Sequence, residues 1–355
     1  MNNNETILVT GSGGFIGGWI AETLHLTHAG NVRAGIRSWS SAARLARFPM
    51  EIVLCDVMDR DSIGRALNGA TRVIHCVAGS SEAIIEGTRN MLEVALANKV
   101  QRFVHLSTTA VYGEAAGKVD ETYPVQSTGD PYVDAKIQAE QLCWEYYKRG
   151  LPVSIVRPPI VYGPFSRDWT VGFAQKLQSG NWGLFQGYGE GICNLVYVVD
   201  LVSGILLAAH HDRAVGEAFN LVGPELVSWN QYFRRFNSSL GLPELKAIAP
   251  QNARLRAAFF DPIRSFGKFV LSHFSAPLRK LSQGNRQARE LMQFADRSLK
   301  TNARSTELSL YNREASYPAD KARELLGYQP IFDLESGLDL SVQWLNNVGL
   351  VAQQL

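Results

Sequence analysis

The sequence predicts a doubly wound α/β fold, in which helices cover both faces of a parallel sheet, followed by a smaller and mostly helical domain. Three observations support this prediction. Short apolar runs alternate with helical periodicity through the first third, and a glycine-rich turn follows the first run. The chain of 355 residues, 46% apolar and 19% charged, can bury two modest cores. We expect the larger domain to comprise residues 1–165 and about 190–222, and the smaller one 166–189 and 223–355.

Five apolar runs have the length and composition of buried strands. They are ILVT (7–10), NVRAGIR (31–37), EIVLCDV (51–57), RVIHCVAG (72–79) and RFVHLSTTAVYG (102–113). The stretches between them have a 3.6-residue period, as in SEAIIEGTRNMLEVALANK (81–99). Ligands of such sheets bind beyond the carboxyl ends of the strands, so candidate site residues are sought there.

The turn after the first predicted strand reads GSGGFIGG. Gly11 would permit a tight turn, Gly13 and Gly14 a close approach of backbone N–H groups to a pyrophosphate, and Gly17 close packing of the next helix. Phe15 and Ile16 would form the first turn of that helix. Strand, glycines and helix in this order predict a Rossmann-type dinucleotide site.

The second predicted strand ends in Arg37, where a fold that prefers NAD would carry an acid for the ribose 2′-hydroxyl. A guanidinium suits the 2′-phosphate of NADP, so NADP(H) is favoured and NAD(H) stays open. Arg44 and Arg47 either assist or are solvated helix residues. Asp56, followed by Val57, either accepts from the adenine amino group or caps the next helix.

Composition indicates a cytoplasmic protein without a metal site. The first ten residues lack the basic start and apolar core of a secretory signal, and no apolar run is long enough for a membrane span. The four cysteines, Cys55, Cys76, Cys143 and Cys193, form no C-x-x-C pair and none is spaced with a histidine as zinc ligands are. We interpret them as reduced core thiols. His75 and His105 alternate along apolar runs and are expected in the core.

A tyrosine four residues before a lysine places both on one helix face, which suits proton transfer. The chain contains this spacing twice, in PYVDAK with Tyr132 and Lys136, and in YPADK with Tyr317 and Lys321. Spacing alone does not choose between the two pairs.

The surrounding motifs distinguish the two pairs. TGSGGFIG, Asp56-Val57, VIHCVA, LSTTAVYG, PYVDAK and IVRPPIVYGP follow one another at spacings that resemble the extended short-chain dehydrogenase/reductase superfamily. The resemblance covers nearly the whole chain and places YPADK in the closing segment. It implies a catalytic set of Thr108, Tyr132 and Lys136, with Ser107 and Thr109 as flanking candidates for the hydroxyl. It also implies cofactor contacts by Cys76, Val77, Ala78, Pro158 and Ile160, and a homodimer.

The acid–base chemistry of these side chains supports the same catalytic set. An isolated tyrosine has a pKa near ~10 and is a poor base at neutral pH. We expect the adjacent Lys136 ammonium and a nicotinamide ring to lower the pKa of Tyr132, while Thr108 donates to the reacting oxygen.

The substrate class is narrowed by departures from the family pattern. Thr109 and Ala110 stand where dehydratases of the family carry an acid pair, so dehydration is not expected. Ile160 and Cys193 replace two residues with which nucleotide-sugar epimerases hold a diphosphate. RPPIVYGP and the segments after it resemble the 3β-hydroxysteroid dehydrogenase branch, which implies hydride transfer at a secondary alcohol or ketone of a bulky apolar substrate. A nucleotide-sugar or lipid-linked sugar epimerase or 4-ketoreductase is the alternative, and a non-catalytic nucleotide-sensing scaffold is a second one.

Residues 246–304 are basic, with twelve Lys and Arg against three acids. Apolar residues recur at helical spacing from 259 to 274, at Phe259, Ile263, Phe266, Val270 and Phe274. A helical cap over the substrate is favoured; peripheral contact of 259–280 with the inner face of a membrane, or phosphate binding, are the alternatives. No nucleic-acid-binding motif accompanies the charge.

Overall fold

A computed structural model of the chain describes residues 5–264 and 301–351. Two compact units make up the structure. Unit 1 comprises residues 1–166, 194–225 and 315–333, and unit 2 comprises 167–193, 226–314 and 334–355. All the residues predicted to bind the cofactor or to act in catalysis lie in unit 1.

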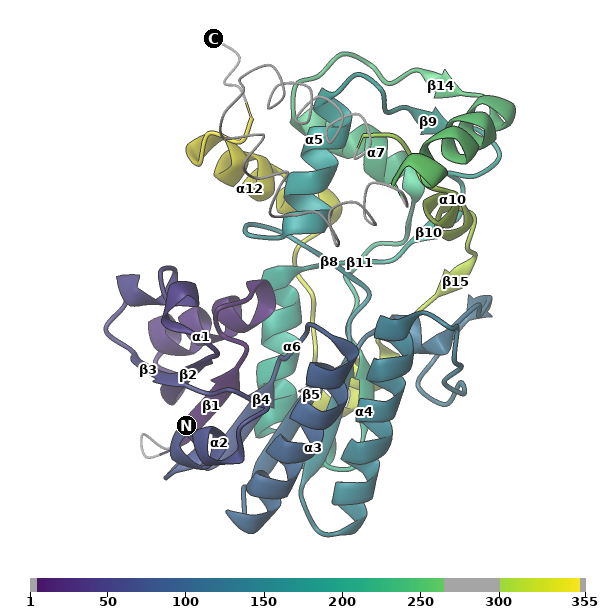
Figure 1. The fold of residues 1–355 in the computed structure, drawn as a ribbon. Coiled ribbons are helices and arrows are strands. Elements are labelled where there is room, and N and C mark those ends of the chain that lie inside the picture. Colours follow the sequence, from purple (N-terminus) through teal and green to yellow (C-terminus); the bar gives the residue numbers. More distant parts are fainter. Residues whose placement is uncertain (1–4, 265–300, 352–355) are drawn as a thin grey trace. The chain divides into compact units, whose positions relative to one another are not determined.

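Unit 1 is built on a seven-stranded parallel sheet, as predicted (Figure 1). Its strands lie in the order β12-β7-β5-β4-β1-β2-β3. Their bounds are β1 Thr6–Thr10, β2 Asn31–Ile36, β3 Glu51–Leu54, β4 Arg72–His75, β5 Arg102–Leu106, β7 Val153–Arg157 and β12 Ala218–Asn220. The chain order reverses between β1 and β4, and ligands bind at such a reversal in open sheets.

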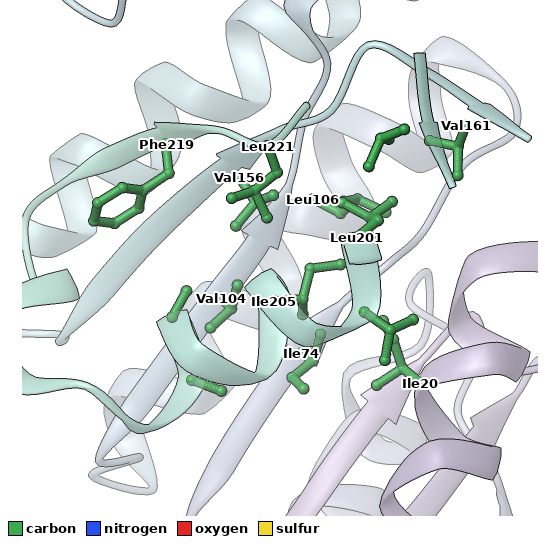
Figure 2. Packing of buried hydrophobic residues seen from close by; sticks show 14 of the residues in the cluster. Ile20, Ile74, Val104, Leu106, Val156, Val161, Leu201, Ile205, Phe219 and Leu221 are labelled. Carbon is green, nitrogen blue, oxygen red and sulfur yellow. The ribbon is translucent and has the colours of Figure 1, made fainter. Parts of the chain in front are cut away.

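Alternate residues along a strand pack into two different hydrophobic clusters. Ile7 and Val9 of β1 contact one cluster, while Leu8 between them contacts the other. The first cluster includes side chains of α1 (Phe15–Thr27) and α6 (Val198–His210), as Figure 2 shows for Ile20, Leu201 and Ile205 over the sheet. The second includes side chains of α2 (Arg60–Leu67), α3 (Ser81–Ala97) and α4 (Pro131–Lys148). Both faces of the sheet are therefore covered, which explains the uninterrupted apolar runs.

Four of the five predicted strands, all but the first, are shorter than predicted because their last predicted residues form the loops beyond the sheet. β3 ends at Leu54 and β4 at His75, so Asp56 and the Cys76–Val77–Ala78 segment lie just past the carboxyl ends. Short elements complete unit 1: β6 (Gly117–Lys118) with β15 (Ala315–Ser316), β8 (Ile160–Tyr162) with β11 (Leu195–Tyr197), α11 (Asp320–Leu326), and the 3-10 turns Trp39–Ser41, Leu45–Arg47, Thr109–Tyr112 and Asp212–Ala214.

The division into units differs from the predicted domains by more than three residues at two places. Residues 315–333 belong to unit 1, because β15 pairs with β6 and the Tyr328 hydroxyl donates to the carbonyl of Val222 at 3.0 Å. Residues 190–193 belong to unit 2, where Cys193 pairs with Val227.

Unit 2 combines helices with two short ladders. Its elements are a π-helical segment Arg167–Gly172, α5 (Phe173–Gln178), α7 (Trp229–Ser239), a helical segment 250–264, α10 (Ser305–Tyr311), α12 (Leu334–Asn347), and the strand pairs β10 (Ile192–Cys193) with β13 (Val227–Ser228) and β9 (Leu184–Phe185) with β14 (Ala247–Ile248). Its core is aromatic: Phe173, Trp182, Trp229, Phe233 and Tyr311 are buried against one another. Among residues 5–264 and 301–351, no helix combines the length and hydropathy that crossing a bilayer requires.

Candidate active site

The glycine turn after β1 leaves no room for side chains. A Cβ at Gly17 would lie 2.4 Å from the carbonyl oxygen of Gly11, and one at Gly11, whose φ is +70°, would lie 2.7 Å from that of Cys76. Gly14 precedes α1 in an extended conformation, and no side chain caps the helix. Among the described residues, no side chain accepts from the N–H groups of the first turn, from Phe15 and Ile16 onward, so the turn fits a pyrophosphate.

The ends of β2 and β3 lie beside this turn. Ser12 donates its N–H to Gly35 at 3.1 Å, and Cys55 donates its N–H to Ile36 at 2.7 Å. Arg37 follows β2 directly; its side chain is exposed and forms no hydrogen bond or ion pair with the described residues. The guanidinium of Arg37 is therefore available to an anionic group of a ligand bound at the glycine turn.

Asp56 does not cap α2. Asp59 does so, by accepting the N–H of Asp61 at 2.9 Å. One carboxylate oxygen of Asp56 accepts the N–H of Met58 at 3.0 Å, which forms a local turn, and the half-buried side chain stays at the end of β3. Of the two predicted roles, helix capping is wrong, and adenine binding stays a prediction.

Arg44 and Arg47 both bind a carboxylate of the protein; the Arg44 side chain is largely covered, whereas that of Arg47 is 56% exposed and so also solvated. Arg44 forms a bidentate pair with Glu22 of α1, at 2.8 and 2.6 Å, and its guanidinium lies 3.8 Å from the centroid of the Phe165 ring. Arg47 adds a third bond to Glu22 at 3.0 Å. The buried carboxylate therefore holds both arginines, and they fasten the segment after β2 to the dinucleotide helix.

Helix α4 positions the proposed acid/base. Asp130 caps it by accepting the N–H groups of Tyr132 and Val133, at 2.9 and 3.2 Å, and Pro131 occupies the first turn, where a missing N–H is harmless. Tyr132 is 43% exposed, and its hydroxyl has no hydrogen-bond partner in the described part of the chain. The hydroxyl is thus free to meet a substrate oxygen.

The pKa of Tyr132 shifts against our expectation. Partial desolvation of the ring raises its pKa above the ordinary value, and the nearby Asp130 carboxylate raises it further. Lys136 does not lower the pKa of Tyr132 in this geometry, because its ammonium is turned toward the sheet. Protein groups alone therefore keep Tyr132 protonated, as a proton donor must be.

Lys136, one turn along α4, is 3% exposed. Its Nζ donates to the carbonyls of Leu106 at 2.7 Å and Val77 at 3.3 Å, and so joins α4 to the end of β5 and to the loop after β4. Burial lowers its pKa to about 8, although the nearby Cys76, Cys143 and Glu140 oppose the shift. A lysine this deeply placed and poised near neutrality is typical of a functional site.

Three residues with hydroxyl groups follow β5, and each has a different environment. Thr108 is half-buried and its Oγ1 accepts the N–H of Ala110 at 3.2 Å, which leaves its proton to donate. Thr109 is buried and donates its N–H to Pro158 at 2.9 Å, which brings the loops after β5 and β7 together. Ser107 is 3% exposed, and its hydroxyl finds no partner among the described residues. Ile160 begins β8 and donates its N–H to Asn194 at 3.3 Å.

A buried ion pair behind the site was not foreseen. Glu140, one turn after Lys136, accepts two bonds from Arg157 of β7, at 2.9 and 2.6 Å. Burial opposes the charge of Arg157, but the carboxylate raises its pKa above the ordinary value. Arg157 also donates to the Tyr112 hydroxyl at 3.0 Å, and Tyr112 donates to Asn220 at 2.8 Å. The network fixes α4 against the sheet, and only the tertiary structure pairs these residues.

The structure thus gathers the loops after β1, β4, β5 and β7 with α4 at one edge of the sheet, and places Arg37 and Asp56 at the neighbouring strands. The sequence model of the NAD dependent epimerase/dehydratase family matches residues 7–222. The chain belongs to this family. It is an enzyme of the extended short-chain dehydrogenase/reductase class, as the motifs predicted, and the non-catalytic alternative is set aside. The family is NAD-dependent, whereas the motifs favoured NADP(H). Nothing in the comparisons singles out the 3β-hydroxysteroid dehydrogenase branch.

Similar proteins of this class act on different small molecules. The chain is 25% identical over 251 residues to an Escherichia coli O157:H7 N-acetyl-α-D-glucosaminyl-diphospho-ditrans,octacis-undecaprenol 4-epimerase, across 67% of this chain and 73% of that protein. It is 24% identical over 343 residues to a Stigmatella aurantiaca 4-hydroxy-2-methyl-3-oxo-4-farnesyl-3,4-dihydroquinoline-1-oxide ketoreductase, across 93% and 94%. The structure resembles the Bacillus cereus UDP-glucuronic acid 4-epimerase in complex with NAD, with a TM-score of 0.70 and 20% identity over 97% and 99% of the two chains.

Proposed function

We propose that the enzyme transfers a hydride at a secondary alcohol carbon of a sugar, as a 4-epimerase or a 4-ketoreductase. The observation that carries the proposal is the free hydroxyl of Tyr132, one helical turn before a buried lysine with its pKa lowered to about 8. The relatives favour a sugar over the bulky apolar ketone that the motifs alone suggested, since one of them is a lipid-linked sugar 4-epimerase.

Each residue has one task in this proposal. Tyr132 gives its proton to the carbonyl oxygen of the substrate during reduction and takes it back during oxidation. Thr108 donates to the same oxygen, and two donors stabilise the negative charge that develops there. Lys136 fastens the loop after β4 and the end of β5 to α4, where it would hold the nicotinamide ribose. The nicotinamide, when bound, supplies or accepts the hydride.

A bulky apolar ketone is the second candidate. Cys193 is fully buried, and burial raises the pKa of its thiol well above the ordinary value, so this position offers no charge to a diphosphate. Ile160 is half-buried and apolar. The farnesyl-quinoline ketoreductase relative matches nearly the whole chain, which supports this candidate.

For the cofactor we propose NADP(H) as the preferred form within a family that uses NAD(H). Arg37 supports the preference because it is exposed, free of partners in the described chain and placed directly after β2. A guanidinium there would bind the 2′-phosphate by charge-assisted hydrogen bonds.

The test is to purify the protein, examine its absorbance for retained dinucleotide, and offer it UDP-N-acetylglucosamine and its undecaprenyl diphosphate counterpart. Interconversion of the 4-epimers without net cofactor change would establish the epimerase. Stoichiometric oxidation of NAD(P)H by a 4-keto sugar would establish the ketoreductase. Turnover of bulky apolar ketones alone would move the second candidate to the front. Activity of Tyr132→Phe equal to that of the wild type would contradict all three.

A further inference from the structure

The helical segment 250–264 of unit 2 presents three large apolar side chains to solvent, while a fourth, Phe260, is half-buried. Leu255, Phe259 and Ile263 are 68%, 65% and 42% exposed. The opposite side of the helix packs inward with small or charged residues: Ala253, Ala257 and Arg264 are 3%, 1% and 8% exposed. An ordinary amphipathic helix of a water-soluble domain has the reverse arrangement.

The three apolar residues form one ridge, since each follows the last by four positions. Polar bonds fix the rotation of the helix. Arg264 donates to Asp261 at 2.7 Å and to the carbonyl of Asn302 at 2.6 Å, and Asp261 accepts the N–H and the hydroxyl of Ser305 at 3.0 and 2.7 Å. Turning the ridge inward would break these bonds and expose the two alanines instead.

Arginines flank the ridge on both sides. Arg254 and Arg256 adjoin Leu255 in sequence, and at 100° per residue they project to opposite sides of it. Both are exposed; Arg254 contacts the Tyr188 hydroxyl, and Arg256 donates to the carbonyl of Asn181 at 3.3 Å. The described residues 246–264 and 301–304 carry five Lys and Arg against one acid, Asp261, so the sequence around the ridge is basic.

We propose that helix 250–264 binds the surface of an anionic lipid bilayer, with Leu255, Phe259 and Ile263 at the acyl boundary and Arg254 and Arg256 at lipid phosphates. An apolar ridge flanked by cations is the arrangement that interfacial helices use. A second copy docked on the same ridge by a two-fold axis would bring like charges together, which disfavours that occupant. The predicted continuation at Phe266, Val270 and Phe274 lies outside the described residues. The proposal does not depend on the reaction.

The test uses the full chain and sedimentation with vesicles of phosphatidylcholine, alone or with phosphatidylglycerol as about a third of the lipid. We expect binding to the anionic vesicles that weakens with salt. Leu255→Ser with Phe259→Ser should weaken it by about tenfold or more, and Arg254→Gln with Arg256→Gln by about tenfold. The matched control is Leu26→Ser with Ile331→Ser, which removes side chains that are 61% and 77% exposed elsewhere.

Absence of binding to anionic vesicles by the wild type would overturn the proposal, and so would an equal loss in the control. A change of oligomeric state in the Leu255/Phe259 variant, without any change in vesicle binding, would assign the ridge to a second copy instead. Nucleotide binding, measured by fluorescence, reports whether each variant is folded.

Discussion

Two cations of unit 1, Lys136 and Arg37, stand at the same edge of the sheet in opposite circumstances. Lys136 is 3% exposed and bonded to two backbone carbonyls, and burial lowers its pKa to about 8. Arg37 is exposed and has no partner among the described residues. The first cation is part of the packed structure, and the second is held ready for a ligand.

The difference separates the reaction from the choice of cofactor. The residues proposed for the reaction are tied into α4 and its buried ion pair, so we expect a change there to disturb both the fold and the chemistry. In our proposal the choice between NAD and NADP rests on Arg37, an exposed side chain whose replacement should have no structural cost. The following variants test this separation, beginning with the largest expected effect.

Breaking the buried ion pair should be the most severe change. Arg157→Met leaves Glu140 charged and unpaired in the core, and we expect a loss of about 3–5 kcal/mol in the free energy of unfolding. Urea denaturation measures it. The double variant Glu140→Gln with Arg157→Met removes the orphaned charge and should regain much of the loss; a single variant as stable as the wild type would show that the pair does not hold α4.

Filling the dinucleotide turn should be next. Gly17→Ala places a Cβ 2.4 Å from the Gly11 carbonyl, which should cost about 1–3 kcal/mol of stability and weaken dinucleotide binding. The control is Gly64→Ala, because a Cβ at this position in α2 meets nothing within 4 Å and alanine favours the helix. Thermal melts and nucleotide titration measure the two variants. Equal melting temperatures and equal nucleotide affinities for the two variants would contradict the account.

The protonation of Lys136 should be visible in the pH dependence. Because the pKa of Lys136 in the folded protein is about 8, below the 10.5 of an exposed lysine, the charge is lost as pH rises through 8 and turnover should fall about tenfold per unit above it. Between pH 8 and 10.5 the unfolded chain binds more protons, so this group makes the folded state more stable as pH rises. Lys136→Met should abolish both trends; an unchanged profile in that variant would assign them to other groups.

Removing Arg37 should have the most selective effect. Arg37→Ala should weaken NADPH binding by about tenfold, about 1.4 kcal/mol, while leaving NADH binding and the melting temperature unchanged. Arg213→Ala, which removes another exposed arginine, is the control. Isothermal titration calorimetry with NADPH and with NADH measures the two affinities. An equal loss of affinity for NADH would show that Arg37 contacts a part that both dinucleotides share.

The sequence predicted what depends on local pattern. Alternating apolar runs and the glycine turn gave the sheet, and the setting of Tyr132 and Lys136 distinguished them from Tyr317 and Lys321. The seven-stranded parallel sheet and the family match confirm the fold class and the superfamily.

The sequence could not predict pairings between distant residues. Nothing local in it shows that Glu22 holds Arg44 and Arg47, or that Glu140 meets Arg157, because such partners are chosen by packing. The expected contribution of Lys136 to a lower pKa of Tyr132 is not seen for the same reason, since the bonds that turn Lys136 toward the sheet are tertiary. Helical periodicity singled out Phe259 and Ile263 but not Leu255, and it did not show which side of the helix faces solvent.

Tyr132→Phe is the variant that tests the central claim most directly, with nucleotide binding and turnover measured on one preparation. The account predicts dinucleotide affinity within about twofold of the wild type, because the hydroxyl has no structural partner in the described chain, and a fall in turnover of about 10²–10⁴-fold. Turnover equal to that of the wild type would contradict the assignment of Tyr132 as the proton carrier.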